Sequence, residues 1–302
     1  MRQEYRPENR DLIVNINGRL VHRDDAGVSP FDSAVQGGDA VWEGLRLYGG
    51  RIFALDAHLA RLEASARALA FAEIPSRQHI RRELRRTLEA NGMRDGVHVR
   101  LTLSRGVKYT SGMDPRLNTA GPTLIILAEF KPPVYDKRGV RLITSSLRRP
   151  APDVLDPRIH HANLIQSILA KIEANHAGAD DALMLDGRGF VAETNATHVF
   201  VVHRGTVETS RLVACPEGVT RATVLELCAG HGIPARETDL SLAAVYGADE
   251  MFCTGTMGEL AAVVEVDGRT IGDGARGPVT ERLSALYEEL TATTGDEIFG
   301  DE

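Results

Sequence analysis

Two short segments carry residue types that bind anions. Residues 218–221, Gly-Val-Thr-Arg, open a predicted helix. The free backbone N–H groups at a helix N-terminus, together with the Thr220 hydroxyl, make a site for a phosphate or carboxylate. Residues 254–256, Thr-Gly-Thr, follow an apolar strand and offer further hydroxyls and amides. Each segment alone is also typical of an ordinary helix cap or turn, so the hypothesis of an anion site depends on their occurring together.

A third segment places a cation on a helix. In residues 56–62, Asp-Ala-His-Leu-Ala-Arg-Leu, His58 and Arg61 are three positions apart and share one helical face. A guanidinium suits a phosphate or carboxylate because its fork of N–H groups binds two oxygens at once. An arginine on an amphipathic helix is more often simply solvated, and that alternative stays open.

Other patterns indicate chemistry that the surrounding sequence does not support. Residues 272–277 have the G-x-G-x-x-G spacing of a dinucleotide loop, but too little chain follows for a βαβ unit. The chain contains no P-loop, G-x-S-x-G or H-E-x-x-H motif. His160 and His161, with Asp153 and Asp156 nearby, have no recognisable metal-ligand spacing. We therefore expect neither a dinucleotide site nor a metal.

The composition is that of an ordinary globular chain of 302 residues, long enough for one large or two medium domains. A net charge of −7 argues against a general nucleic-acid binder. No apolar run approaches the ~20 residues of a membrane helix, and the N-terminus lacks a signal-peptide pattern. Three cysteines, an odd number, fit a reducing compartment. These features predict a cytoplasmic protein that binds neither membranes nor nucleic acid.

The N-terminal part reads as strands, two helices and further strands. The predicted elements are a hairpin at 12–22 turning at Asn17-Gly18, helices beginning after Asp56 and after Pro75-Ser76, and strands at 97–103 and 123–129. Asp56 is the expected cap of the first helix, and Asn91-Gly92 the end of the second. The strand at 123–129 is apolar enough to be buried on both faces.

Residues 131–139, Lys-Pro-Pro-Val-Tyr-Asp-Lys-Arg-Gly, form an interdomain linker, because two prolines and four charges do not suit a central strand. The linker separates a small N-terminal domain, 1–130, from a larger C-terminal domain, 140–302. Strands and helices mix there without strict βαβ alternation, so the expected fold class is α+β. The expected C-terminal elements are strands near 140–146, 182–186, 190–193, 197–202 and 251–254, and helices after Asn163, Thr220 and Pro278.

Taken in order, these segments resemble the class IV aminotransferases, a family of pyridoxal-phosphate (PLP) enzymes that includes branched-chain and D-amino-acid aminotransferases, (R)-amine transaminases and aminodeoxychorismate lyase. The likeness spans nearly the whole chain. The matching segments are Asn17-Gly18, 38–46, 55–58, Arg61-Leu62, Ser65-Ala66, Arg105-Gly106, 170–174, 191–193, 218–221, 249–256 and 277–280. The resemblance implies a two-domain, fold type IV architecture, with a small α/β domain and a larger β-barrel-like domain carrying helices. It also implies a homodimer.

The resemblance further implies a cofactor site for PLP. Arg61 would hold the phosphate together with the N-terminus of the helix that follows Gly218. Glu193 would face the pyridine nitrogen and keep the ring protonated, which makes the ring an electron sink. The implied cofactor residues are Arg61, Glu193, Asn195, Val219, Thr220 and Thr256.

The resemblance also implies a substrate side rich in guanidinium groups, which suit a carboxylate. The implied substrate residues are Trp42, Arg46, His98, Arg100, Arg105 and Met257. Trp42 stands where relatives often have tyrosine or phenylalanine. Arg105-Gly106 resembles the D-amino-acid branch, whereas residues 43–46, Glu-Gly-Leu-Arg, resemble the branched-chain enzymes. The sequence leaves the choice between these substrates open.

One departure from the family pattern concerns the catalytic lysine. In the family this lysine lies three or four residues before the asparagine that is Asn163 here, so the corresponding positions are His160 and Ile159. The lysine links the cofactor covalently and moves a proton. An imidazole cannot form the link, but with an ordinary pKa of ~6.5 His160 can serve as the acid or base. None of the four lysines occupies this position: Lys108, Lys131, Lys137 and Lys171.

Three interpretations follow. The first is a PLP-binding aminotransferase that moves amino groups between an amino acid or amine and a 2-oxo acid, weakly and with the cofactor bound noncovalently. The second is a family member with different chemistry, in which His160 is the acid/base. The third is a non-enzymatic PLP-binding homologue. The retained phosphate segments and Glu193 argue against the third, and the first is the working interpretation.

Overall fold

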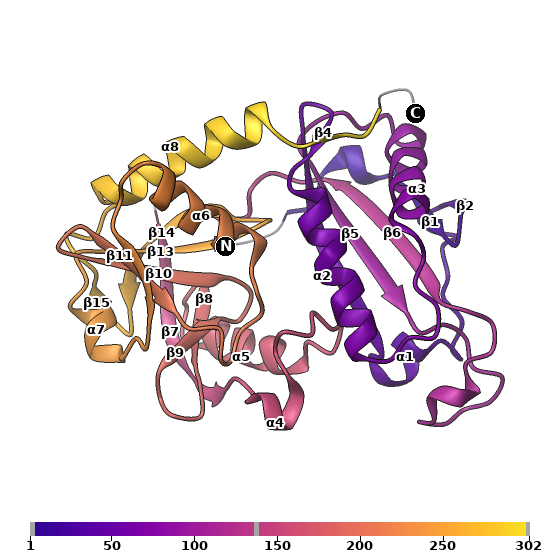
Figure 1. Cartoon of the computed structure of the whole chain (residues 1–302), viewed down its shortest axis with the longest axis horizontal. Helices are drawn as coiled ribbons and strands as arrows, with labels where there is room; N and C mark the ends of the chain where they lie inside the picture. Colours follow the sequence, from indigo (N-terminus) through magenta and orange to yellow (C-terminus); the bar gives the residue numbers. More distant parts are fainter. Residues whose placement is uncertain (1–3, 136–138, 300–302) are drawn as a thin grey trace. The chain divides into compact units, whose positions relative to one another are not determined.

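The computed structural model describes residues 4–135 and 139–299, and the chain divides into two compact units (Figure 1). Among the described residues, the N-terminal unit comprises 4–132, 159–163 and 291–299, and the C-terminal unit comprises 133–135, 139–158 and 164–290. The segment that contains His160 therefore folds with the N-terminal unit, although 26 residues separate it from Pro132. The domain limits expected from the sequence, 1–130 and 140–302, stay a prediction.

The N-terminal unit is built on a seven-stranded antiparallel sheet with the order β16-β4-β3-β5-β6-β1-β2. The predicted hairpin is confirmed, because β1 and β2 pair and its turn residues Asn17 and Gly18 have φ of 51° and 79°. The strands are β1 (Ile13–Ile16), β2 (Arg19–His22), β3 (Ala40–Tyr48), β4 (Arg51–Ile52), β5 (Val97–Ser104), β6 (Thr123–Phe130) and β16 (Asp296–Glu297).

Two helices, α2 (Leu55–Ala68) and α3 (Arg77–Ala90), pack their apolar sides on one face of this sheet (Figure 1). Leu59 and Leu62 of α2, with Leu84 of α3, are fully buried against it. Removal of such aliphatic side chains from water is the main stabilising contribution to this core. The short helices of the unit are α1 (Ser33–Gly37) and the 3-10 turns Pro7–Asn9 and Pro115–Leu117.

The two helix starts differ from each other in how they are capped. Ser76 caps α3, since its side chain accepts a hydrogen bond from the backbone of His79 at 3.2 Å. The prediction that Asp56 caps the first helix was wrong. The cap position is Ala54, with φ of 50°, and Asp56 lies inside the first turn, where it accepts a hydrogen bond from Arg81 at 2.8 Å.

Alternation along the central strands separates two kinds of side chain. Leu45 of β3 and Leu101 of β5 point into the core, and the residues directly before and after each of them point to the opposite face of the sheet. The strand predicted at 123–129 follows the same rule. Leu124, Ile126 and Ala128 on its core face are buried, but Ile125 and Leu127 on the other face are only half-buried. The expectation of burial on both faces is therefore correct for the core face only.

The C-terminal unit contains a mixed sheet with the order β12-β11-β10-β13-β14-β7-β8-β9, and β15 pairs with β14. The pairs β11–β12, β14–β7 and β7–β8 are parallel, and the remaining pairs are antiparallel. Every predicted strand of this half is found, and the α+β class is confirmed. The strands are β7 (Val140–Arg148), β8 (Asp181–Leu185), β9 (Val191–Thr194), β10 (His198–His203), β11 (Thr206–Ser210), β12 (Ala235–Thr238), β13 (Glu250–Gly255), β14 (Glu259–Val266) and β15 (Arg269–Thr270).

Helices connect these strands (Figure 1). The helix α5 links the parallel strands β7 and β8 and packs on the sheet through the fully buried Ala170 and Ala174. None of the helices in residues 4–135 and 139–299 is long and apolar enough to cross a lipid bilayer. The helices are α4 (Pro152–Leu155), α5 (Ile165–His176), α6 (Val219–Gly230), α7 (Leu242–Tyr246) and α8 (Pro278–Thr293), which confirms the predicted helix starts near Asn163, Thr220 and Pro278.

Candidate functional site

A fully buried carboxylate joins the cation-bearing helix to the sheet of the N-terminal unit. Glu43 lies on the core face of β3 and accepts two hydrogen bonds from Arg61, Nε to Oε1 at 2.8 Å and Nη2 to Oε2 at 2.6 Å. Nδ1 of His58 lies 2.7 Å from the same Oε2. The predicted common face of His58 and Arg61 is thus confirmed, and it points at Glu43. Burial alone would raise the pKa of Glu43, but the charge and hydrogen bonds of Arg61 lower it to about 2.

The segment that carries His160 is attached to the free edge of β3. The backbone N–H of Trp42 donates to the carbonyl of His160 at 3.1 Å, and the N–H of Ala162 donates to the carbonyl of Ala40 at 2.8 Å. The indole Nε1–H of Trp42 donates to the carbonyl of His161 at 3.1 Å. Residues 159–163 therefore extend the sheet locally, and this pairing places the His160 ring beside Glu43.

The His160 ring is itself hydrogen-bonded. Its Nδ1 lies 2.5 Å from the carbonyl oxygen of Trp42 and 3.6 Å from Oε1 of Glu43, and its backbone N–H donates to Oγ of Ser65 at 3.0 Å. Burial, followed by the positive charge of Arg61, lowers the pKa of His160 to about 3. This value is far below the ordinary imidazole pKa of ~6.5, so the ring is neutral at physiological pH.

Four of the expected substrate residues lie on the face of the N-terminal sheet opposite the core. Arg46 pairs with His98 across β3 and β5, and Trp42 lies two positions before Gly44, which pairs with Arg100. The Arg100 guanidinium lies 3.5 Å from the centroid of the Trp42 ring. Burial lowers the pKa of Arg100 to about 10, so it keeps its charge at neutral pH.

His98 in this group is neutral. Burial, and then the charges of Lys131, Arg46 and Arg100, lower the pKa of His98 to about 3. Its Nε2 is buried and has no hydrogen-bond partner among the residues that the structure describes. This face therefore presents guanidinium groups and an unsatisfied imidazole nitrogen, which suits an anionic group with oxygen atoms.

Arg105, the fifth expected substrate residue of this unit, holds a loop. Its Nε donates to Oδ2 of Asp39 at 2.6 Å, and its Nη2 donates to the carbonyl of Leu69 at 2.7 Å. The guanidinium also lies 4.6 Å from the centroid of the Phe71 ring. These contacts occupy Arg105 within the protein, so its role toward substrate stays a prediction.

The C-terminal unit contains the residues expected around a cofactor ring. Glu193 on β9 is buried and forms an ion pair with Arg149, which follows β7. Arg149 also donates to Oγ of Ser167 on α5 at 3.3 Å. Asn195 acts structurally here, because its Oδ1 accepts from the backbone of Ala182 at 2.8 Å.

The expected phosphate segments lie in the same unit. The helix α6 begins at Val219, and its cap residue, Gly218, offers no side chain, so no side-chain hydrogen bond caps the first turn. A Cβ at position 218 would lie 2.5 Å from the ring of His198, which explains the glycine. The hydroxyl of Thr254 is buried without a hydrogen-bond partner among the described residues, two positions before Thr256. Open helix amides and threonine hydroxyls are the donors that a phosphate requires, so these residues fit the phosphate of PLP.

Met257, expected on the substrate side, accepts a backbone hydrogen bond from Val134 at 3.0 Å.

Two of the three described lysines have partners of their own. Lys171 forms an ion pair with Asp181 at 3.2 Å, and the amino group of Lys108 donates to the carbonyl of Gly112 at 2.6 Å. Lys131 follows β6 directly and contributes positive charge near His98. Lys137 lies outside the described residues.

Two important residues were missed from the sequence. Glu43 interrupts the alternating core positions of β3, between Val41 and Leu45, and a charged residue in such a series signals a buried ion pair. Arg149 left no comparable signal, because its pairing with Glu193 depends on the register of β7, β8 and β9.

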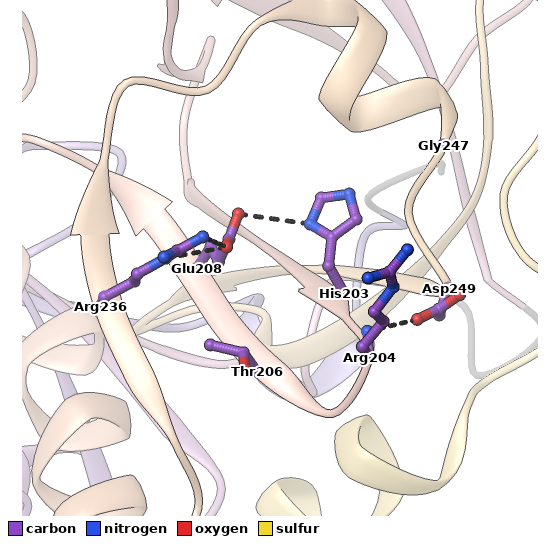
Figure 2. Close-up of a pocket in the computed structure, with 7 residues that line it drawn as sticks. All are labelled: His203, Arg204, Thr206, Glu208, Arg236, Gly247 and Asp249. Carbon is purple, nitrogen blue, oxygen red and sulfur yellow. Dashed lines mark hydrogen bonds and ion pairs between the residues drawn. The ribbon is translucent and has the colours of Figure 1, made fainter.

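A polar pocket of about 690 Å³ lies elsewhere in the C-terminal unit (Figure 2). Both of its carboxylates are already hydrogen-bonded. The carboxylate of Glu208 contacts His203 at 3.3 Å and Arg236 at 2.9 Å, and Asp249 accepts from the backbone of Arg204 at 2.6 Å. The lining residues are His203, Arg204, Thr206, Glu208, Arg236, Gly247 and Asp249.

Comparison with known proteins agrees with this geometry. The model of the amino-transferase class IV family matches residues 40–266. Branched-chain-amino-acid aminotransferase-like protein 2 of Arabidopsis thaliana is 52% identical over 290 residues, which are 96% of this chain and 52% of the relative. The chain thus spans about half the length of that relative. A putative branched-chain-amino-acid aminotransferase of Methanocaldococcus jannaschii is 37% identical, with 95% of this chain and 99% of the relative covered.

Solved structures agree as well. The T.th. branched-chain amino acid aminotransferase with pyridoxamine 5'-phosphate superposes with a TM-score of 0.87 and 32% identity. The match covers 93% of this chain and 94% of that chain. The chain belongs to the class IV aminotransferase family, so the resemblance seen in the sequence and the fold type IV architecture are confirmed.

Proposed function

We propose that this protein binds PLP and transfers amino groups between an amino acid or amine and a 2-oxo acid. The observation that carries the proposal is the combination, within the C-terminal unit, of the buried Glu193 with the uncapped N-terminus of α6. Glu193 is an acceptor for a protonated pyridine nitrogen, and the α6 amides with Thr220 are donors for a phosphate. Membership of the aminotransferase family supports the same assignment.

The chain's residues would divide the work as follows. Bound PLP supplies a ring that accepts the electron pair left when the substrate carbon loses its proton. Glu193, which forms an ion pair with Arg149, would accept a hydrogen bond from the protonated ring nitrogen. Arg61 supplies a further cation for the phosphate. Arg46 and Arg100 would orient the substrate through a carboxylate.

We propose that His160 takes the position of the family lysine. PLP would then be held noncovalently, and the activity would be weak, because the imidazole can accept a proton but cannot form the covalent link. Its low pKa also makes it a weak base. The alternative is a different reaction in which His160 is the acid/base. The backbone pairing of the His160 segment with β3 favours it, because this pairing holds the ring in a defined position.

The experiment is His160→Lys, with His161→Lys as the matched control. If His160 occupies the lysine position, H160K attaches PLP covalently, seen as a visible band that borohydride fixes to the chain. It also gains transamination of a branched-chain or D-amino acid with 2-oxoglutarate by up to ~10²–10⁴-fold. The control shows neither. If the alternative reaction is correct, H160K and His160→Ala lose the native activity equally. Absence of PLP binding by the original protein would refute the whole proposal.

We propose that the protein is a homodimer, and the helix α5 supports this. The helix turns its small residues toward the sheet and its large aliphatic ones outward, the reverse of an ordinary surface helix. Ile165, Ile168, Leu169 and Ile172 are 61%, 52%, 46% and 44% exposed. A second copy would cover such a stripe symmetrically. Sedimentation should show a dimer at micromolar concentration and a monomer for Ile168→Glu, whereas a monomeric original protein contradicts the proposal.

A further inference from the structure

Trp42 contacts the His160 segment through its ring and its backbone. The two rings are stacked, with centroids 4.4 Å apart and an interplanar angle of 28°. The carbonyl oxygen of Trp42 lies 2.5 Å from Nδ1 of His160, and the backbone N–H of Trp42 donates to the carbonyl of His160 at 3.1 Å. The indole N–H donates to the carbonyl of His161 at 3.1 Å. One side chain and its peptide groups therefore determine the position and the orientation of the imidazole.

These contacts select one tautomer. A carbonyl oxygen only accepts hydrogen bonds, so Nδ1 of His160 carries the proton and Nε2 carries the lone pair. No residue in the described part of the chain donates a hydrogen bond to Nε2. The side chain is 17% exposed, and Nε2 is not among the buried polar atoms that lack a partner, so we infer that it is the nitrogen within reach of a ligand or water. The imidazole is thus presented with its acceptor nitrogen outward.

The charged groups around the ring complete the arrangement. Glu43 from β3 lies 3.6 Å from Nδ1, and the α2 residues Arg61 and His58 both contact Glu43. Arg61 opposes a positive charge on the imidazole, and Glu43 favours it. A phosphate bound to Arg61 would offset the Arg61 charge and make His160 a better proton acceptor.

Tryptophan is suited to this position in a way that other aromatic residues are not. Phenylalanine has no N–H to donate to the His161 carbonyl, and the hydroxyl of tyrosine extends from the far end of its ring. The Trp42 ring also lies beneath the Arg100 guanidinium, at 3.5 Å from centroid to Cζ. It therefore connects His160 with the expected substrate face.

We propose that Trp42 is the positioning residue of His160: it fixes the Nδ1–H tautomer, so that Nε2 is the proton acceptor of the site. If a substrate C–H bond is broken in this site, Nε2 would accept the proton, and bound PLP would supply the ring that takes up the electron pair. Glu43 then faces the imidazolium. The identity of the substrate that gives up the proton rests on the proposed function, whereas the tautomer of His160 is independent of it.

The experiment is ¹⁵N NMR of the histidine rings in the protein without added cofactor, with His160 assigned from the His160→Asn spectrum. The variants are Trp42→Phe, which keeps a ring and loses the N–H, and Trp42→Ala, which loses both. The matched control is Tyr48→Phe on the same face of β3. We expect a single Nδ1–H form in the original protein and in Y48F. W42F should show a mixture with the Nε2–H form, and W42A a larger share of that form.

An unchanged His160 tautomer in W42F would overturn the inference, even if W42A failed to fold. A loss of thermal stability without a change at His160 would do the same, because it would mean that Trp42 only packs. PLP titration of the original protein is measured separately. If PLP does not bind but W42F alters the tautomer, the proposed function fails and the positioning role of Trp42 stands.

Discussion

The same three residue types, a glutamate between a histidine and an arginine, meet twice in this molecule. In the N-terminal unit the glutamate, histidine and arginine side chains are 0%, 2% and 15% exposed. In the C-terminal unit they are 8%, 27% and 66% exposed and line an open pocket (Figure 2). The first cluster is Glu43, His58 and Arg61, and the second is Glu208, His203 and Arg236.

The difference between the two clusters lies in the access of water. Where water is excluded, each charge depends on its partners for stabilisation, and removal of one partner leaves an uncompensated charge. Where the arginine remains solvated, the ion pair adds little. Residue types and contacts alone would make both clusters candidate sites. Only the first cluster is buried so completely that its charged groups depend on one another, and only the first cluster adjoins His160.

The largest expected effect is on stability. Glu43→Gln keeps the shape of the side chain but leaves Arg61 without its buried counterion, so we expect the free energy of unfolding in urea to fall by about 3–5 kcal/mol. Glu208→Gln is the matched control and should cost less than about 1 kcal/mol. Equal losses in the two variants would contradict the contrast drawn between the clusters.

A second prediction concerns acid. His98 and His160 have a pKa of about 3 in the folded protein, against an ordinary value near 6.5. Below pH 6.5 the unfolded chain binds protons at these two histidines and the folded protein does not. Their contribution to the free energy of unfolding is therefore complete well above pH 6.5 and is lost as the pH falls below it. Each histidine contributes a slope of up to about 1.4 kcal/mol per pH unit, or about 2 kcal/mol between pH 6.5 and 5.

Urea unfolding across this pH range tests the prediction. Glu43 does not interfere, because its contribution is lost only below pH 4.5, as pH falls toward its folded pKa of about 2. His98→Gln and His160→Gln should each flatten the slope, and the double variant should flatten it further. A slope that neither substitution changes would show that both rings titrate normally.

The sequence predicted those elements whose signals are local. The turn at Asn17-Gly18 and the start of α3 at Ser76 depend on residues a few positions apart. The start of α6 after Gly218 was predictable for the same reason, whereas its role toward a phosphate stays a prediction. The choice of Asp56 as a cap failed because Ala54 adopts a left-handed conformation that no local pattern indicates.

The charge states of the site were not predictable in this way. Glu43 meets Arg61 because α2 packs on the core face of β3, and His160 reaches them only because a segment far along the chain pairs with the edge of that strand. The sequence therefore placed His160 in the family pattern, but it offered only the ordinary pKa of an imidazole as a guide to its charge. Burial, which depends on these long-range contacts, sets the actual value.

A third prediction concerns cofactor binding. If Arg61 binds the phosphate as we propose, Arg61→Ala should weaken PLP binding at least tenfold, about 1.4 kcal/mol. Arg236→Ala, in the exposed cluster, should leave the affinity unchanged. Absorbance or fluorescence titration measures both. A normal affinity in R61A would mean that the α6 segment suffices to hold the phosphate.

The smallest expected effect tests how tightly the His160 segment is bound to the buried cluster. Ser65 is 2% exposed, and its hydroxyl accepts the backbone N–H of His160 at 3.0 Å. Ser65→Ala leaves that N–H without its partner and should cost about 1 kcal/mol in urea unfolding. Ser76→Ala, which removes the cap of α3, should cost a similar ~1 kcal/mol, so stability alone does not separate the two variants.

Coupling to Trp42 separates them. Ser65 and Trp42 hold the same short segment, so their effects on stability should be non-additive by at least about 0.5 kcal/mol in the S65A/W42F double variant. Ser76 shares no partner with Trp42 in the described part of the chain, and S76A/W42F should therefore be additive. The His160 ring signals should also move in S65A and not in S76A. Additivity in both double variants would mean that the segment is held by independent contacts, and that the order of the buried cluster does not extend to His160.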